Sequence, residues 1–160
     1  MALRLDATDR RILRELMADG ALTNVALAQR VGLSAPPCLR RVRALEDAGV
    51  IQGYTALVDE RALGFALTAF AMVGLYSQAE PDLNAFENRV LGWPIVREAY
   101  MLSGESDYIL KCVAPDLSAF QDFVLKVLTA APNVASVKTT LAIRRAKLAS
   151  GVTLTGPEEE

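Results

Sequence analysis

The sequence predicts an α+β chain built from two small domains, a helical N-terminal third and a mixed α/β remainder. Glycines and prolines divide the first 50 or so residues into three amphipathic segments with helical spacing. The rest alternates β-prone apolar runs with amphipathic stretches in the order β-α-β-β-α-β. The chain has 160 residues, 52% of them hydrophobic and 22% charged, so it can form packed cores and is not wholly disordered.

The first helix is predicted to begin at Asp6 or Thr8, either of which can cap it, and to end near Gly20. Its apolar stripe consists of Leu3, Ile12, Leu13, Leu16 and Met17. A short second helix is predicted to start after Thr23 and to end at Gly32. Its apolar side chains are Val25, Leu27, Ala28 and Val31.

The third helix is predicted to run from a cap at Ser34 to Gly49, with Pro36 and Pro37 in its first turn. Proline suits this turn because backbone N–H groups there have no partner within the helix. About four residues, one of them glycine, separate the second and third helices, which is the turn length of a helix-turn-helix. The N-terminal third therefore predicts a helix-turn-helix, winged-helix-like domain.

The third helix has two contrasting faces. Cys38, Val42 and Leu45 fall on one side, which we expect to be the core. Arg40 and Arg43 fall on the other, and arginine can bind guanine edges or neutralise phosphate. Exposed arginines are often only solvated surface. Here the stretch from Gly20 to Leu45 holds four arginines and no acid, which favours DNA binding.

Residues 50–58 are β-prone and are predicted to form a strand or wing that leads out of the helical domain, with a hinge near 59–61. The predicted division is 1–52 for the helix-turn-helix domain, 53–62 for the strand and linker, 63–145 for the second domain, and 146–160 for a C-terminal tail. We expect its last three residues, Glu158, Glu159 and Glu160, to be frayed.

The second domain is predicted to be ferredoxin-like, with two helices on one face of a four-stranded sheet. Both the odd and the even positions of 65–75 are apolar, so the second face of the sheet must also be covered. A second subunit that packs on this face is the simplest way to cover it. The predicted strands are 65–75, 95–102, 107–113 and 134–143, the helices 81–90 and 115–128, and the turn 103–106.

Composition excludes several classes of function. The chain has no histidine, so catalytic triads and histidine-ligated metals are ruled out, and it shows no nucleophile–base pair or phosphate loop. Cys38 and Cys112 stand alone, which argues against zinc and disulfides and suits a reducing cytoplasm. We expect no signal peptide, no membrane span and no enzymatic activity.

Three segments carry a resemblance to a known family. The run from Val31 to Tyr54, VGLSAPPCLRRVRALEDAGVIQGY, resembles the third-helix signature of the Lrp/AsnC transcription factors. Leu5, Asp6, Asp9, Ile12, Leu13 and Leu16 are similar to the family's first helix. Residues 103–108, SGESDY, resemble the Gly–Asp–Tyr segment of its effector domain. The resemblance covers about residues 3–145.

The resemblance implies a prokaryotic, nucleoid-associated regulator that binds double-stranded operator DNA. It also implies a homodimer that assembles into tetramers or octamers, a small effector, usually an amino acid, and no other cofactor. The candidate DNA-contacting residues are Thr23, Asn24, Ser34, Pro36, Arg40, Arg41 and Arg43. The candidate effector-binding residues are Tyr100, Ser103, Gly104, Asp107, Ser136 and Thr139.

The chemistry of these residues suits an amino acid. Asp107 can accept from an ammonium group, backbone N–H groups near Gly104 can bind a carboxylate, and hydroxyls on Ser136, Thr139 or Thr140 can complete the site. Alternatively, Gly104 and Asp107 only shape a tight hairpin. The chain departs from the family in Ala35-Pro36, Ser106 and Val137-Lys138-Thr139.

Two other functions remain open at this point. An effector-independent, architectural DNA-binding protein would bind DNA with little sequence preference. A metabolite-binding module would not bind DNA at all.

Overall fold

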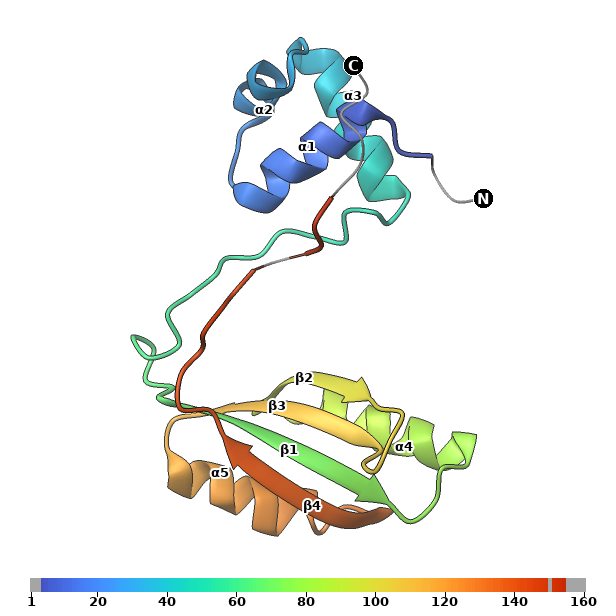
Figure 1. Cartoon of the computed structure of the whole chain (residues 1–160), viewed down its shortest axis with the longest axis vertical. Helices are drawn as coiled ribbons and strands as arrows, with labels where there is room; N and C mark the ends of the chain where they lie inside the picture. Colours follow the sequence, from blue (N-terminus) through green and yellow to red (C-terminus); the bar gives the residue numbers. More distant parts are fainter. Residues whose placement is uncertain (1–3, 150, 155–160) are drawn as a thin grey trace. The chain divides into compact units, whose positions relative to one another are not determined.

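The computed structural model describes residues 4–149 and 151–154. The chain folds into two compact units (Figure 1). The helical unit comprises residues 1–57 and 147–160, and the sheet unit comprises residues 58–146. Within the described part of the chain, no helix has the length and apolar character needed to cross a membrane.

The helical unit contains the three predicted helices, α1 (Ala7–Ala18), α2 (Asn24–Val31) and α3 (Ala35–Asp47). Of the two predicted caps of α1, Asp6 is the one used, and with Asp9 it forms a capping box. Gly32 ends α2 in the left-handed conformation at φ 74°, where glycine carries no steric cost. The turn between α2 and α3 is three residues long, Gly32–Ser34.

One apolar core holds these helices together. Cys38 is fully buried in it, as the helical wheel predicts, and burial raises the pKa of its thiol. Leu154, in the C-terminal segment, also packs against this core. Leu3 and Glu158–Glu160 lie outside the described residues. The buried set is Ile12, Leu13, Leu27, Ala28, Val31, Cys38, Val42 and Leu45.

The predicted strand or wing over 50–58 is wrong, because these residues form no strand. A strand needs a neighbour for its backbone groups. Here the N–H groups of Val50 and Ile51 donate instead to the carbonyl of Leu45, at 2.9 and 3.1 Å. Further along, Leu57 is 70% exposed, so no packing compensates for the missing partner.

The sheet unit has the predicted βαββαβ order and the ferredoxin-like strand order β2-β3-β1-β4, with every pair antiparallel. The second predicted helix is α-helical only in its first half and continues as a π-helical segment. The elements are β1 (Leu67–Leu75), α4 (Glu80–Leu91), β2 (Val96–Met101), β3 (Tyr108–Ala114), α5 (Leu117–Phe123), η1 (Val124–Leu128) and β4 (Val134–Leu141).

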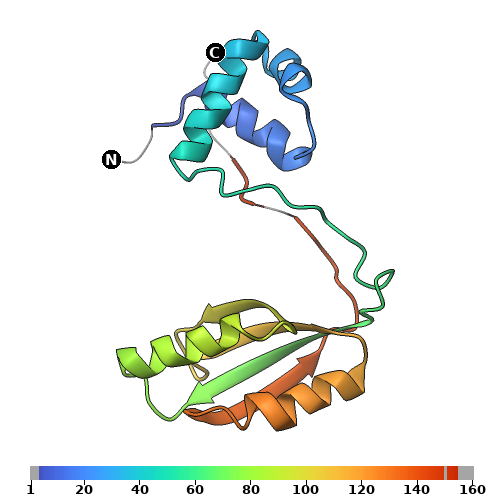
Figure 2. The same cartoon turned by 180° about the vertical axis from the view of Figure 1, so that it is seen from behind.

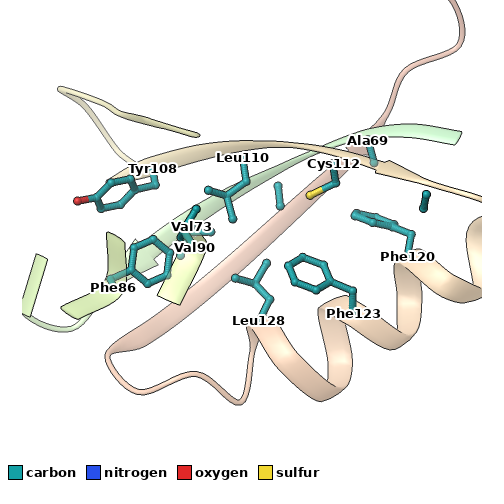
Figure 3. Close-up of a cluster of buried hydrophobic side chains, with 12 residues drawn as sticks. Ala69, Val73, Phe86, Val90, Tyr108, Leu110, Cys112, Phe120, Phe123 and Leu128 are labelled. Atoms are coloured by element: carbon teal, nitrogen blue, oxygen red, sulfur yellow. The ribbon is translucent and has the colours of Figure 1, made fainter. Parts of the chain in front are cut away.

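Helices α4 and α5 cover the same face of the sheet (Figure 2). The side chains between them and the sheet form the main core, shown in Figure 3. The opposite side of the sheet, here called the open face, presents half-buried Phe70 and Met72 from β1 and half-buried Ile109 and Lys111 from β3. Large apolar side chains therefore remain uncovered within the single chain.

Candidate DNA-binding surface and effector site

Helix α3 presents a basic, exposed face. Pro36, Arg40 and Arg43 are all exposed, whereas Cys38, Val42 and Leu45 are buried behind them. Ser34 occupies the N-cap position, but its hydroxyl makes no capping hydrogen bond, so it is free to bind a ligand. Among the described residues, Arg40 and Arg43 take part in none of the ion pairs. These four residues form one surface with two unpaired charges.

Arg41 is oriented differently from its neighbours. Its Nη1 donates to Asp6 Oδ2 at 2.6 Å and to Asp9 Oδ1 at 2.8 Å. The pKa of the Asp6 carboxyl is lowered, first by the hydrogen bond from the Asp9 backbone N–H and further by Arg41. The structure therefore places Arg41 in a different environment from the exposed Arg40 and Arg43, with which the prediction groups it.

Thr23 and Asn24 also have structural partners. The hydroxyl of Thr23 caps α2 by accepting from the N–H of Ala26 at 3.2 Å. The amide of Asn24 donates to the carbonyl of Ala35 at 2.8 Å, which joins the start of α2 to the start of α3. Asn24 therefore fixes the geometry of the turn, and its side-chain amide is not free to reach DNA.

The predicted effector residues meet, in part, at one end of the sheet. Asp107 Oδ2 accepts from the N–H of Leu75 at 2.6 Å, and Oδ1 accepts from the side-chain amide of Gln78 at 2.7 Å. The carboxylate thus joins β3 to the end of β1 and does not bond to its own turn. A carboxylate has about four acceptor positions, so capacity remains for a ligand.

The turn that contains Ser103 and Gly104 is attached to β4 by an ion pair of Lys138 and Glu105 at 2.6 Å. Ser136 lies on β4 directly opposite Gly74 of β1. A Cβ atom at Gly74 would come within 2.5 Å of Ser136 Oγ. Gly74 and Gln78 also lie at this end of the sheet, although no local sequence pattern marks them, and Glu105 belongs to the SGESDY segment.

Tyr100 and Thr139 lie apart from this group. Tyr100 stands opposite Ile109, on the open face, and its hydroxyl donates to Glu98 at 3.1 Å. Thr139 stands opposite Ala71, whose side chain faces the helices. Because side chains alternate along a strand, Thr139 and Ser136 point to opposite faces, and Thr140 shares the face of Ser136. One pocket on the open face can therefore use Thr140 with Ser136, but not Thr139.

A cavity of about 580 Å³ lies at the other end of β1, and no sequence pattern predicts it. Glu60 and Arg145, which are far apart in sequence, form an ion pair at 2.9 Å in its wall. The described residues contain no group of three or more side chains that could hold a metal ion. The lining residues are Val58, Asp59, Glu60, Arg61, Phe65, Ala66, Thr68, Phe70, Lys111, Ala142, Ile143, Arg144 and Arg145.

Two family models match the chain. A winged helix-turn-helix DNA-binding model matches residues 5–52, and the Lrp/AsnC ligand binding domain matches residues 68–152. The chain belongs to the Lrp/AsnC family. It is a DNA-binding transcription regulator with a ligand-binding domain, and the family is not one of enzymes.

Curated relatives of this Lrp/AsnC protein carry regulator names. It is 60% identical to a leucine-responsive regulatory protein of Rhizobium meliloti, over 91% of this chain and 93% of the relative. It is 43% identical to the Bkd operon transcriptional regulator of Pseudomonas aeruginosa, over 91% and 95%. It is 40% identical to the leucine-responsive regulatory protein of Escherichia coli K12, over 89% and 87%.

Solved structures agree with the fold. A transcriptional regulator from Neisseria meningitidis, in complex with L-methionine, is 37% identical with a TM-score of 0.89, covering 94% of this chain and 97% of that one. An AsnC family transcriptional regulator from Agrobacterium tumefaciens is 35% identical with a TM-score of 0.88 and the same coverage, 94% and 97%.

Proposed function

We propose that this Lrp/AsnC protein reads a specific operator sequence with the exposed face of α3, and that an amino acid changes its DNA affinity or its oligomeric state. The observation that carries the proposal is that Arg40 and Arg43 lie exposed on one face of α3, outside the ion pairs of the described residues. We place its action in the prokaryotic cytoplasm, on nucleoid DNA, with no cofactor besides the effector.

DNA binding is tested by titrating labelled operator DNA with protein at several salt concentrations. Arg43→Met is expected to weaken operator binding roughly tenfold, because one good base contact contributes about 1–3 kcal/mol. Arg97→Met is the matched control, since Arg97 is an exposed arginine on β2. Equal binding of Arg43→Met and the unmodified protein would contradict the role of α3. Equal affinity for operator and random DNA would instead support an architectural protein.

The open face of the sheet is proposed to be covered by a second copy of the chain, and such dimers to assemble into tetramers or octamers. Half-buried Phe70, Met72 and Ile109 leave apolar area on this face that water would otherwise contact. Ile109→Asp is expected to lower the sedimentation coefficient to that of a monomer. Leu125→Asp is the control, because Leu125 is a 68% exposed apolar residue of η1, away from the open face.

The effector is proposed to bind at the end of the sheet formed by Asp107, Gly104 and Ser136. Support comes from the spare acceptor capacity of Asp107 and from the L-methionine complex of the Neisseria meningitidis regulator. The test is thermal unfolding with a panel of amino acids. A ligand at 100 times its Kd stabilises by roughly 2.7 kcal/mol, which raises Tm by several degrees.

Asp107→Asn is expected to abolish the ligand-induced rise in Tm, because the amide cannot pair with an ammonium group as a carboxylate does. Asp122→Asn, at an exposed ion pair with Lys126, is the control. Comparing each variant with and without ligand removes its own effect on stability. If no amino acid of the panel raises Tm, the effector proposal is contradicted. If an amino acid raises Tm equally in Asp107→Asn, the ligand binds at a site that does not include Asp107.

A further inference from the structure

Three arginines lie within four positions of α3, but they do not share one environment. Arg40 and Arg43 are exposed, whereas Arg41 is half-buried against the start of α1. On a helical wheel of α3, Arg40 and Arg43 face outward, whereas Arg41 lies on the side next to α1. Helical periodicity thus separates Arg41 from the other two, and the tertiary structure supplies its partners, Asp6 and Asp9.

The two carboxylates that Arg41 binds are held in place before it reaches them. The N–H of Asp9 donates to Asp6 Oδ1 at 2.8 Å, and the N–H of Asp6 donates to Asp9 Oδ2 at 3.2 Å. Each aspartate therefore has its other oxygen free, and Arg41 Nη1 binds both of those oxygens. The capping box of α1 thus forms a preorganised acceptor for one guanidinium group of α3.

The remaining contacts between α3 and its unit are mostly apolar. Burial of Cys38, Val42 and Leu45 holds the helix against the core, but hydrophobic contact is non-directional and leaves small rotations inexpensive. Directional hydrogen bonds restrict such rotation. Asn24 supplies one at the start of α3, Arg41 supplies two more half a helix further on, and Glu46 near the end of α3 accepts one from the Tyr54 hydroxyl.

We propose that Arg41 is a positioning residue for DNA recognition. With Asp6 and Asp9 it fixes the rotation of α3 about its own axis, and so the direction in which Arg40 and Arg43 point. Arg41 itself makes no DNA contact. This inference rests on the proposed reading of DNA by the exposed face of α3.

The salt dependence of DNA binding distinguishes a positioning residue from a residue that contacts phosphate. A side chain that neutralises a DNA phosphate releases counterions, so its removal lowers the slope of log affinity against log salt by about 0.9. Arg41 is already paired with two carboxylates, so its removal is expected to lower affinity without changing that slope. Arg43→Met is expected to lower affinity by removing a base contact, and so serves as the reference for direct recognition by α3.

Asp9→Asn provides the sharpest test. Removing a negative charge from a surface near DNA normally strengthens binding, because repulsion falls. The positioning role predicts the reverse, a roughly tenfold loss that corresponds to about 1.4 kcal/mol, since the amide holds Arg41 less well. Asp47→Asn is the matched control, because Asp47 is an exposed acid of α3 outside the ion pairs of the described residues, and it should bind DNA at least as well as the unmodified protein.

The experiment measures operator affinity against salt for the full chain and for Arg41→Met, Asp9→Asn, Arg43→Met and Asp47→Asn. Far-UV circular dichroism checks that each is folded at the assay temperature. The double variant Arg41→Met/Asp9→Asn is expected to lose no more affinity than Arg41→Met alone, because both changes break one interaction. If Arg41→Met does not fold, Asp9→Asn retains the side-chain shape and keeps the test decisive.

Two results would overturn the positioning role. One is Asp9→Asn binding as tightly as the unmodified protein or more tightly. The other is a fall of about 0.9 in the salt slope for Arg41→Met, which would show a direct phosphate contact. If Arg43→Met itself has no effect, the proposed reading of DNA by α3 fails instead, so the two failures are distinguishable.

Discussion

The two candidate sites of this protein are built in different ways. The candidate DNA-binding residues Ser34, Pro36, Arg40 and Arg43 come from α3 and its N-cap position, and neither arginine joins an ion pair of the described residues. The candidate effector residues come from β3, β4 and a turn, and Asp107 is already bonded to Leu75 and Gln78. A site on one helix is set by helical periodicity, whereas a site shared among strands depends on register and cross-links.

The sheet unit buries aromatic side chains in its core, whereas the buried core residues of the helical unit are aliphatic apart from Cys38. The largest expected effect comes from removing one of these aromatic side chains. Phe86 is 1% exposed and contacts Tyr108 and Trp93 in the sheet core. Phe86→Ala is expected to destabilise the sheet unit by about 3–5 kcal/mol, since it leaves a cavity. Denaturant unfolding followed by the single tryptophan, Trp93, reports on this unit. An unchanged midpoint would contradict the packing shown in Figure 3.

A smaller effect is expected from the segment that returns to the helical unit. Leu154 is half-buried against the core of α1–α3, and Gly151 lies against Met17 in a left-handed conformation, at φ 69°. Leu154→Asp is expected to destabilise the helical unit by about 1–2 kcal/mol through lost apolar burial. Val152→Asp, at a 71% exposed position, is the control and should leave the unfolding midpoint unchanged. Equal effects of both changes would show that the segment is not docked.

The next effect, on thermal stability, comes from the close approach of β1 and β4 at Gly74 and Ser136. Gly74→Ala places a Cβ 2.5 Å from Ser136 Oγ, so the serine must change rotamer. We expect a loss of about 1 kcal/mol, measured by thermal unfolding. The double variant Gly74→Ala/Ser136→Ala removes the conflicting oxygen and should recover most of the loss. No recovery would place the strain in the backbone of β1.

The smallest effect concerns pH. The pKa of Asp6 is lowered by the hydrogen bond from the Asp9 backbone N–H and by Arg41, so its folded-state pKa lies below the ordinary 3.8. Its contribution to stability is complete above the ordinary pKa and is lost as the pH falls through the folded value. Asp6→Asn keeps a cap at α1 but removes this dependence. Unfolding midpoints between about pH 5 and pH 2 should therefore fall less steeply for Asp6→Asn.

The structure confirms the predictions that depend on local sequence patterns. Sequence reasoning predicted α1, α2 and α3, the α2–α3 turn, and the order of the sheet unit, because caps, glycines and periodicity are read within a few residues. It failed at 50–58, where β propensity was high but the described part of the chain provides no partner strand. It also grouped Asn24 and Arg41 with the free DNA-facing residues, although their partners, Ala35, Asp6 and Asp9, are 11 to 35 positions away.

The sequence by itself determined the helix boundaries, the inward and outward faces of α3 and the family resemblance, because each depends on short-range spacing. Only the tertiary structure decided the partners of Arg41 and Asp107, the opposite orientation of Ser136 and Thr139, and the docking of Leu154. The physical reason is that directional hydrogen bonds and strand register join residues distant in the chain, and no local pattern records which distant groups will meet.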